Sequence, residues 1–362
     1  MFLINYKIIC TFFEKSIKKS LFFQFNLRFA PLSCSFSPAK SYLCMRKFIV
    51  HKKKMSVKDL TTVLGTAIGE LSDKDSMGGM FHEHRDGAPL PSGPALQEIV
   101  GLCRAILFPG FYGNSNLNSK TLEYHIGVSV ERLYQLLVEQ IMAGLCFTQS
   151  PDEPVCPTEQ AQRLAAEFVT KLPNLRKVLA TDVDAAYNGD PAATSKGEII
   201  SCYPIIKAIT NYRIAHELYL QGVPLIPRII TEMAHSETGI DIHPAAQIGH
   251  HFTIDHGTGV VIGATCIIGN YVKLYQGVTL GARSFPLDED GNPIKGIPRH
   301  PILEDNVIVY SNATILGRIT IARGTVVGGN LWVTESTEPG EHLVQAKKRK
   351  THVVRPEDFG CL

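Results

Sequence analysis

Two histidines in the second half of the chain stand directly beside charged residues. His256 follows Asp255, and His300 follows Arg299. An imidazole is the side chain best suited to act as a general base near neutral pH, because its ordinary pKa is about 6.5. Each pair also interrupts a regular sequence pattern, so we predict that both pairs serve one reactive cleft. The histidines for which a surface or packing role is expected are His82, His84, His250 and His251.

The pattern around these pairs is a six-residue spacing of aliphatic side chains. An α-helix has a period of about 3.6 residues and a β-strand a period of about two, so neither produces this spacing. Three six-residue segments make one coil of a triangular parallel β-helix, in which stacked aliphatic residues form a continuous core. The spaced residues are Ile242, Ile248, Ile254, Ile262, Ile268, Leu274, Leu280, Leu303, Val309, Ile315, Ile321, Val327 and Val333.

Two interruptions of the spacing locate the expected chemistry. The first adds two residues within 254–259, and the second is an excursion over 282–301 that returns to the coil at Arg299 and His300. A repeat departs from its period where something outside the core requires it. A β-sandwich of short strands is the alternative fold, but chance seldom keeps so many positions in register.

The region from about 59 to 237 is predicted to be helical. Apolar residues recur there at spacings of three and four, as in helices that bury one face. Such helices can cover one open end of a β-helix. The expected helices span 96–108, 121–145, 158–187 and 203–220. The predicted fold class is therefore α+β, with an all-helical N-terminal domain followed by a parallel β-helix solenoid.

Charge is divided unequally along the 362 residues. Residues 1–54 hold eleven Lys or Arg and one acidic residue, whereas the remainder holds 25 basic and 33 acidic residues. An acidic main body lacks the positive surface of a nucleic-acid-binding protein, which excludes that class. The basic extension is either sequence upstream of a true start at Met55, which we favour, or an organellar transit peptide. The expected location is accordingly cytoplasmic, with an organelle as the alternative.

No uncharged apolar run reaches the roughly 18 residues of a membrane span. The nine cysteines include no Cys-x-x-Cys pair. We therefore expect reduced thiols rather than a disulfide framework or a cysteine-type zinc site.

Several motifs closely resemble serine O-acetyltransferase, the hexapeptide-repeat enzyme of cysteine biosynthesis. Those in the repeat region are Asp241-Ile-His-Pro-Ala-Ala-Gln-Ile-Gly, Ile254-Asp-His-Gly-Thr-Gly, Gly277-Val-Thr-Leu-Gly and Arg299-His300-Pro. Upstream, Asn188-Gly-Asp-Pro-Ala and Tyr212-Arg-Ile-Ala-His match the helical domain of that family. Many acyltransferases share hexapeptide repeats, whereas this set of charged pairs is far more specific. The resemblance implies that the catalytic domain is a left-handed parallel β-helix.

The resemblance also implies acetyl transfer from acetyl-CoA to the hydroxyl of L-serine. By similarity, His256 is the general base that activates the hydroxyl, and Asp241 orients its imidazole like the carboxylate of a catalytic triad. His300 belongs to the same catalytic set. The residues implied to bind serine are Arg299 and His300, at its carboxylate and reacting end, and Asp190 and Asp255, at its ammonium.

The family forms trimers, so the resemblance implies a homotrimer or a dimer of trimers with each active site between adjacent subunits. CoA would lie in the groove between solenoids, and no metal is expected. The positions that match the family's CoA contacts are Gly281, Ala282, Ser311, Asn312 and Gly329. Tyr310-Ser311-Asn312 replaces the usual run of Gly and Ala there. The basic cluster at 347–350 is either a contact for CoA phosphates or a solvated face.

The expected domains are a basic extension over 1–54, a helical domain over 55–240, the β-helix over 241–340 and a tail over 341–362. Many family members end in Ile and insert that tail into O-acetylserine sulfhydrylase. This chain ends in Gly360-Cys361-Leu362. The resemblance therefore suggests this partner, although the chain end departs from the family pattern.

Three other protein classes share parts of the pattern. A hexapeptide-repeat acetyltransferase for a sugar or an antibiotic has the solenoid and a catalytic histidine, but lacks the helical domain that carries Asp190. A solenoid carbonic anhydrase needs three histidine ligands around zinc, whereas His256 and His300 lie beside Asp and Arg. A non-catalytic scaffold would have lost one of the two charged pairs, and both are intact.

Overall fold

The computed structural model describes residues 57–82, 90–113, 116–148 and 157–345, and the chain divides into two compact units between His82 and Glu83. The smaller unit contains helix α3 (Val57–Ser72) and the 3-10 helix η2 (Lys74–Met77). The expectations for the extension over 1–54, the cluster at 347–350 and the chain end fall outside the described residues. Among the helices that are described, none is both long and apolar enough to cross a membrane.

The described part of the larger unit begins with helices. Those expected from the spacing of apolar residues are present as α4, α5, α6 and α8, with ends shifted by a few residues. Ser92 caps α4, because its hydroxyl accepts a hydrogen bond from the backbone N–H of Ala95. The bounds are α4 (Gly93–Leu107), α5 (Leu122–Thr148), α6 (Thr158–Gly189), α7 (Lys196–Cys202), α8 (Pro204–Leu220) and α9 (Ile226–Thr238).

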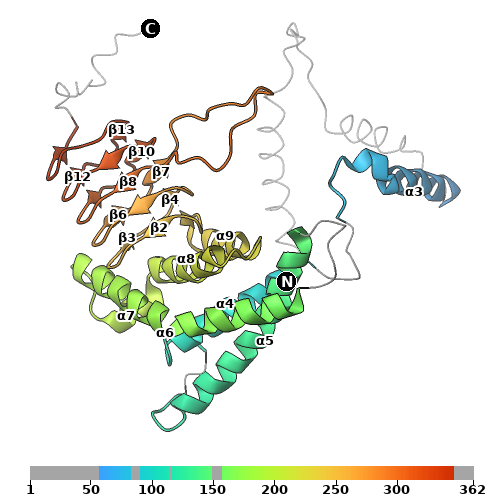
Figure 1. Ribbon diagram of the computed structural model, residues 1–362, viewed down its shortest axis with the longest axis horizontal. Coiled ribbons are helices and arrows are strands. Elements are labelled where there is room, and N and C mark those ends of the chain that lie inside the picture. Colours follow the sequence, from blue (N-terminus) through green and yellow to red (C-terminus); the bar gives the residue numbers. More distant parts are fainter. Residues whose placement is uncertain (1–56, 83–89, 114–115, 149–156, 346–362) are drawn as a thin grey trace, which may run out of the picture. The chain divides into compact units, whose positions relative to one another are not determined.

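Short parallel strands follow the helices and wind into three sheets. We name the sheets by their first strands: the β1 sheet (β1-β4-β7-β10-β13), the β2 sheet (β2-β5-β8-β11) and the β3 sheet (β3-β6-β9-β12-β14). Successive strands belong to different sheets, so each coil passes from one sheet to the next. This arrangement confirms the predicted α+β class with a hexapeptide-repeat β-helix. Figure 1 shows the coils stacked away from α8 and α9, with β2 and β3 nearest the helices and β13 far from them.

The strand bounds are β1 (Asp241–Ile242), β2 (Gln247–Ile248), β3 (Thr253–Asp255), β4 (Val261–Ile262), β5 (Ile267–Ile268), β6 (Lys273–Tyr275), β7 (Thr279–Gly281), β8 (Ile302–Leu303), β9 (Ile308–Val309), β10 (Thr314–Leu316), β11 (Thr320–Ile321), β12 (Val326–Val327), β13 (Trp332–Val333) and β14 (His342–Leu343). Most contain only two residues, so the core cannot come from long alternating strands. It comes instead from equivalent positions of successive coils, which lie above one another.

The predicted inward positions form the core of the solenoid. All thirteen spaced residues are buried except Ile248, which is half-buried and packs against the same core. A second inward series, which the sequence reading did not identify, lies two residues before the first. Its buried members are Ile240, Ala246, Phe252, Val260, Cys266, Val272, Val278, Pro301, Val307, Ala313 and Thr325.

Two of the described cysteines, Cys103 and Cys266, lie in the hydrophobic core. Within the part of the chain that the structure describes, Cys103, Cys202 and Cys266 are free thiols. Burial raises the pKa of the Cys103 and Cys266 thiols to about 12, which makes them packing residues rather than nucleophiles.

Helices α6 and α8 cover the first coil of the solenoid. Arg213 on α8 pairs with Asp182 on α6 at 2.7 Å, and both side chains are buried. Arg213 also donates to the carbonyl of Gly249 at 2.8 Å, and Asp182 accepts from the backbone N–H of Phe252 at 3.0 Å. These bonds satisfy backbone groups at the first edge of the stack, which would otherwise be unpaired. Further contacts run from Tyr212 to the Ala246 carbonyl, from His216 to the Pro244 carbonyl and from the His251 N–H to Thr181.

Candidate active site

His256 lies at the corner between the β3 sheet and the β1 sheet. It follows β3 directly and has a φ of 58°, a left-handed conformation that residues other than glycine seldom adopt. Gly257 follows at a φ of 92°, where a Cβ would come within 2.5 Å of Ile240 Cδ1. The His256 side chain is 75% exposed, and its Nε2 lies 3.8 Å from Oδ1 of Asp255. The insertion therefore presents an exposed imidazole with a carboxylate beside it.

Asp190 lies near the same corner, directly after the end of α6. Its carboxylate accepts hydrogen bonds from the Tyr203 hydroxyl and from the backbone N–H of Ala192. These bonds, with smaller contributions from the charges of Lys273 and His256, hold the pKa of Asp190 below its usual value. The bond to Asp190 also raises the pKa of Tyr203 to about 12. Asp190 is thus an ionised carboxylate that lies close enough to His256 for the two charges to interact.

His300 lies at a different corner, where the chain returns from its excursion between β7 and β8. Its Nδ1 accepts a hydrogen bond from the backbone N–H of Thr265 at 3.2 Å and lies 2.8 Å from the Thr265 hydroxyl. A backbone N–H can only donate, so we assign the proton of the neutral ring to Nε2. Burial, together with the charges of Arg299, His243 and Arg318, lowers the pKa of His300 to about 4. Near neutral pH, His300 is therefore an uncharged donor.

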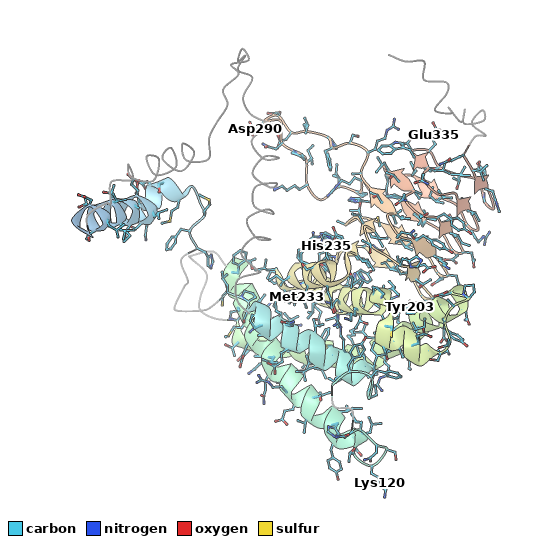
Figure 2. The ribbon with its side chains drawn as sticks, turned by 180° about the vertical axis from the view of Figure 1, so that it is seen from behind. Lys120, Tyr203, Met233, His235, Asp290 and Glu335 are labelled. Carbon is cyan, nitrogen blue, oxygen red and sulfur yellow. The ribbon has the colours of Figure 1, made fainter. Side chains whose placement is uncertain are left out.

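Arg299 precedes His300 at the base of the excursion. Its guanidinium carbon lies 5.8 Å from the centroid of the Phe285 ring. Its Nε is buried and has no hydrogen-bond partner among the described residues. A planar cation with an unused donor suits a carboxylate. Figure 2 shows the excursion reaching out from the solenoid to Asp290.

Asp241, on β1, is grouped differently. Within the described chain, no hydrogen bond or ion pair joins it to His256. The side-chain ligand atoms of Asp241, Glu232 and His235 lie within 4.8 Å of one another. Among the described residues, these three side chains form a group with the chemistry to hold a metal ion. The backbone of β1 nevertheless runs beside the His256 corner, because Asp241 N donates to the carbonyl of Val260 at 2.9 Å.

The predicted site residues therefore divide between two corners of one chain. His256, Asp255 and Asp190 lie at the first, and Arg299 and His300 at the second. The expected CoA contacts divide in the same way. Ser311, Asn312 and Gly329 lie at the first corner in later coils, and Gly281 and Ala282 lie at the second. One chain alone does not bring His256 and His300 together.

Three residues that support the site were not identified from the sequence. Tyr203 holds Asp190, Thr265 holds His300, and Lys273 donates to the carbonyl of Gly189 at 2.6 Å. Tyr203 and Thr265 belong to no recognisable motif, so nothing in the sequence marked their hydroxyl groups as part of a site. A lysine on a short strand is typical of a solvated face, so Lys273 gave no signal either.

Comparison with known proteins gives a consistent result. No family model matches the chain. A protein named "Serine acetyltransferase, plasmid", from Synechococcus elongatus, is 50% identical over 266 residues, which cover 72% of this chain and 83% of that protein. A serine acetyltransferase from Bacillus licheniformis is 43% identical over 191 residues, which cover 51% of this chain and 84% of that protein.

Solved structures agree with these relatives. Serine acetyltransferase 1 from Entamoeba histolytica, in complex with L-cysteine, has a TM-score of 0.61 at 34% identity and covers 77% of this chain and 94% of that chain. Serine acetyltransferase isoform 3 from the same organism, in complex with cysteine, has a TM-score of 0.59 at 31% identity. That match covers 72% of this chain and 86% of the other.

Proposed function

The chain belongs to the serine acetyltransferase family, and from this membership we propose how its own residues transfer acetyl from acetyl-CoA to L-serine. It is an acyltransferase, and the family uses acetyl-CoA as cosubstrate. The relatives do not favour the alternative of a sugar acceptor. The observation that carries the proposal is the placement of Asp190, Asp255 and His256 at one corner.

His256 is the proposed general base. It takes the proton of the serine hydroxyl as the oxygen attacks the thioester carbonyl carbon. The tetrahedral intermediate then releases the CoA sulfur, which receives the proton from His256, and the products are O-acetyl-L-serine and CoA. The carboxylate of Asp255, 3.8 Å from the ring, favours the imidazolium formed between these steps. Asp241 is the proposed orienting carboxylate, supported by the course of β1 beside this corner.

Asp190 and Asp255 are the proposed ligands of the serine ammonium, since both are carboxylates near the base. Arg299 and His300 are the proposed ligands of the serine carboxylate and the reacting end. The unused Nε of Arg299 supports the first role, and the neutral Nε2–H of His300 supports the second. A donor beside the reacting oxygen stabilises the charge that develops there.

The site is proposed to be completed by a second copy of the chain, in a homotrimer or a dimer of trimers. The support is that His256 and His300 lie at different corners of one solenoid. A neighbouring copy that presents its second corner to the first would unite them. CoA would then lie between the copies, against Gly281 and Ala282 of one and Ser311, Asn312 and Gly329 of the other.

Release of CoA thiol from acetyl-CoA tests the acceptor. We expect release with L-serine and none above background with L-alanine, which has no hydroxyl, or with a panel of sugars. Serine turnover would also produce O-acetyl-L-serine, detectable by mass spectrometry. Thiol release with a sugar but not with L-serine would contradict the proposed ligands of the ammonium and carboxylate.

Gly263 provides a test of the role of His300. A Cβ at this position would lie 2.0 Å from Cδ2 and 2.2 Å from Nε2 of His300. Gly263→Ala should therefore displace the imidazole and lower kcat/KM for serine by about 10²-fold, the order expected for a misplacement of roughly 1 Å. Gly127→Ala is the matched control, because no atom lies within 4 Å of a Cβ there. Equal kinetics for the two variants would contradict a role for His300.

A further inference from the structure

Lys273 lies on β6 and belongs to none of the expected site positions. Its partners along the β3 sheet are Thr253 and Ile308, which carry no charge. Its side chain is only 17% exposed. Removing an ammonium group from water is costly unless it is paired and hydrogen-bonded. The reason for a lysine here must therefore lie in what the ammonium contacts.

The ammonium group of Lys273 bridges the helices and the solenoid. Its Nζ donates to the carbonyl of Gly189 at 2.6 Å and lies 3.7 Å from Oδ2 of Asp255. Gly189 is the last residue of α6, directly before Asp190. The ammonium therefore contacts the backbone that carries one of the two proposed serine-binding carboxylates and the side chain of the other.

The aromatic residues next to Lys273 restrict its position. Nζ lies 4.6 Å from the centroid of the Tyr275 ring, within the range of a cation–π contact. Tyr275 in turn stacks on Tyr310 of the next coil, with ring centroids 4.9 Å apart and planes 17° apart. The lysine head is thus held by an oxygen, a carboxylate and an aromatic face.

We propose that Lys273 is a positioning residue that holds Asp190 and Asp255 in the geometry that receives the serine ammonium. This role rests on the proposed function of those two carboxylates. Asp255 lies between two basic groups, with Oδ2 facing Lys273 and Oδ1 facing His256. Lys273 therefore fixes the carboxylate beside the base. Its charge also offsets the repulsion between two carboxylates in one site.

Substitution of Lys273 tests this proposal in the full-length enzyme. Lys273→Met keeps the apolar stem and removes the charged donor, whose hydrogen bonds are among the stronger ones in proteins. It should raise KM for L-serine by roughly tenfold and leave KM for acetyl-CoA unchanged. Lys273→Arg retains the charge and a donor, and should restore KM for serine to within about threefold of the parent. A purely structural lysine would not affect the two substrates differently.

Lys196→Met is the control, because Lys196 is 57% exposed and pairs with Asp184 outside the site. Its kinetics should equal those of the parent. An unchanged KM for serine in Lys273→Met would overturn the proposal. A parallel rise of both KM values with a lower urea midpoint would also overturn it, because Lys273 would then only join the helices to the solenoid.

Asp255→Asn separates this proposal from the one on which it rests. If Asp255→Asn raises KM for serine but Lys273→Met does not, only the role of Lys273 fails. If Asp255→Asn and Asp190→Asn both leave KM for serine unchanged, the proposed ammonium ligands fail. If Asp255→Asn raises KM for serine, and the double variant with Lys273→Met has the same KM as Asp255→Asn alone, the two residues act as one unit, as proposed.

Discussion

Replacing His256 with asparagine should lower kcat for serine acetylation by about 10²-fold to 10⁴-fold, the range that a general base contributes. Asparagine is chosen because His256 has a φ of 58°, and asparagine tolerates the left-handed conformation better than alanine does. The corner and Asp255 are thereby retained, so KM for serine and for acetyl-CoA should change little. Thiol release at saturating concentrations of both substrates measures the effect.

His251→Asn is the matched control for this substitution. His251 also has a left-handed backbone, with a φ of 54°, and its ring stacks on Tyr271 with centroids 4.3 Å apart. It lies at another corner, between β2 and β3, and should keep the parent kcat. A His256→Asn enzyme that kept more than about a tenth of the parent kcat would refute His256 as the base.

The core of the solenoid could be predicted because a single six-residue spacing determines which aliphatic residues point inward. A flat face with a turn takes six residues, so each inward aliphatic residue identifies the next. The second inward series was missed because it mixes aliphatic residues with Ala246, Cys266 and Thr325, and so shows no uniform hydrophobic signal. Helix α9 (Ile226–Thr238) was not among the expected spans, and neither was α7. With seven residues (Lys196–Cys202), α7 is too short for a helical period to appear.

The candidate site could be predicted in part, because His256 and His300 stand at the two interruptions of the repeat. The interruptions alone predicted one cleft, and the family resemblance placed that cleft between adjacent subunits, so that His256 and His300 need not meet within one chain. His256 follows a strand of the β3 sheet and His300 precedes a strand of the β2 sheet, so the two lie at different corners. Lys273 could not be identified, since its contact with Gly189 joins residues 84 positions apart.

The second large effect is expected from Asp182, at the junction of the helices and the first coil. Asp182→Ala leaves the guanidinium of Arg213 buried without its carboxylate and removes the acceptor for the N–H of Phe252. The loss of one partner from a buried ion pair costs about 3–5 kcal/mol. We expect the free energy of unfolding, measured by urea titration with circular dichroism at 222 nm, to fall by that amount.

Asp184 offers a control on the same helix. It pairs with Lys196 at 2.6 Å, but the two side chains are 39% and 57% exposed, and exposed pairs contribute only about 0–1 kcal/mol. Asp184→Ala should therefore leave the urea midpoint nearly unchanged. Asp182→Asn, which keeps an acceptor for Phe252 but not the charge, should lie between the two. Equal midpoints for Asp182→Ala and Asp184→Ala would contradict a stabilising role for the buried pair of Asp182 and Arg213.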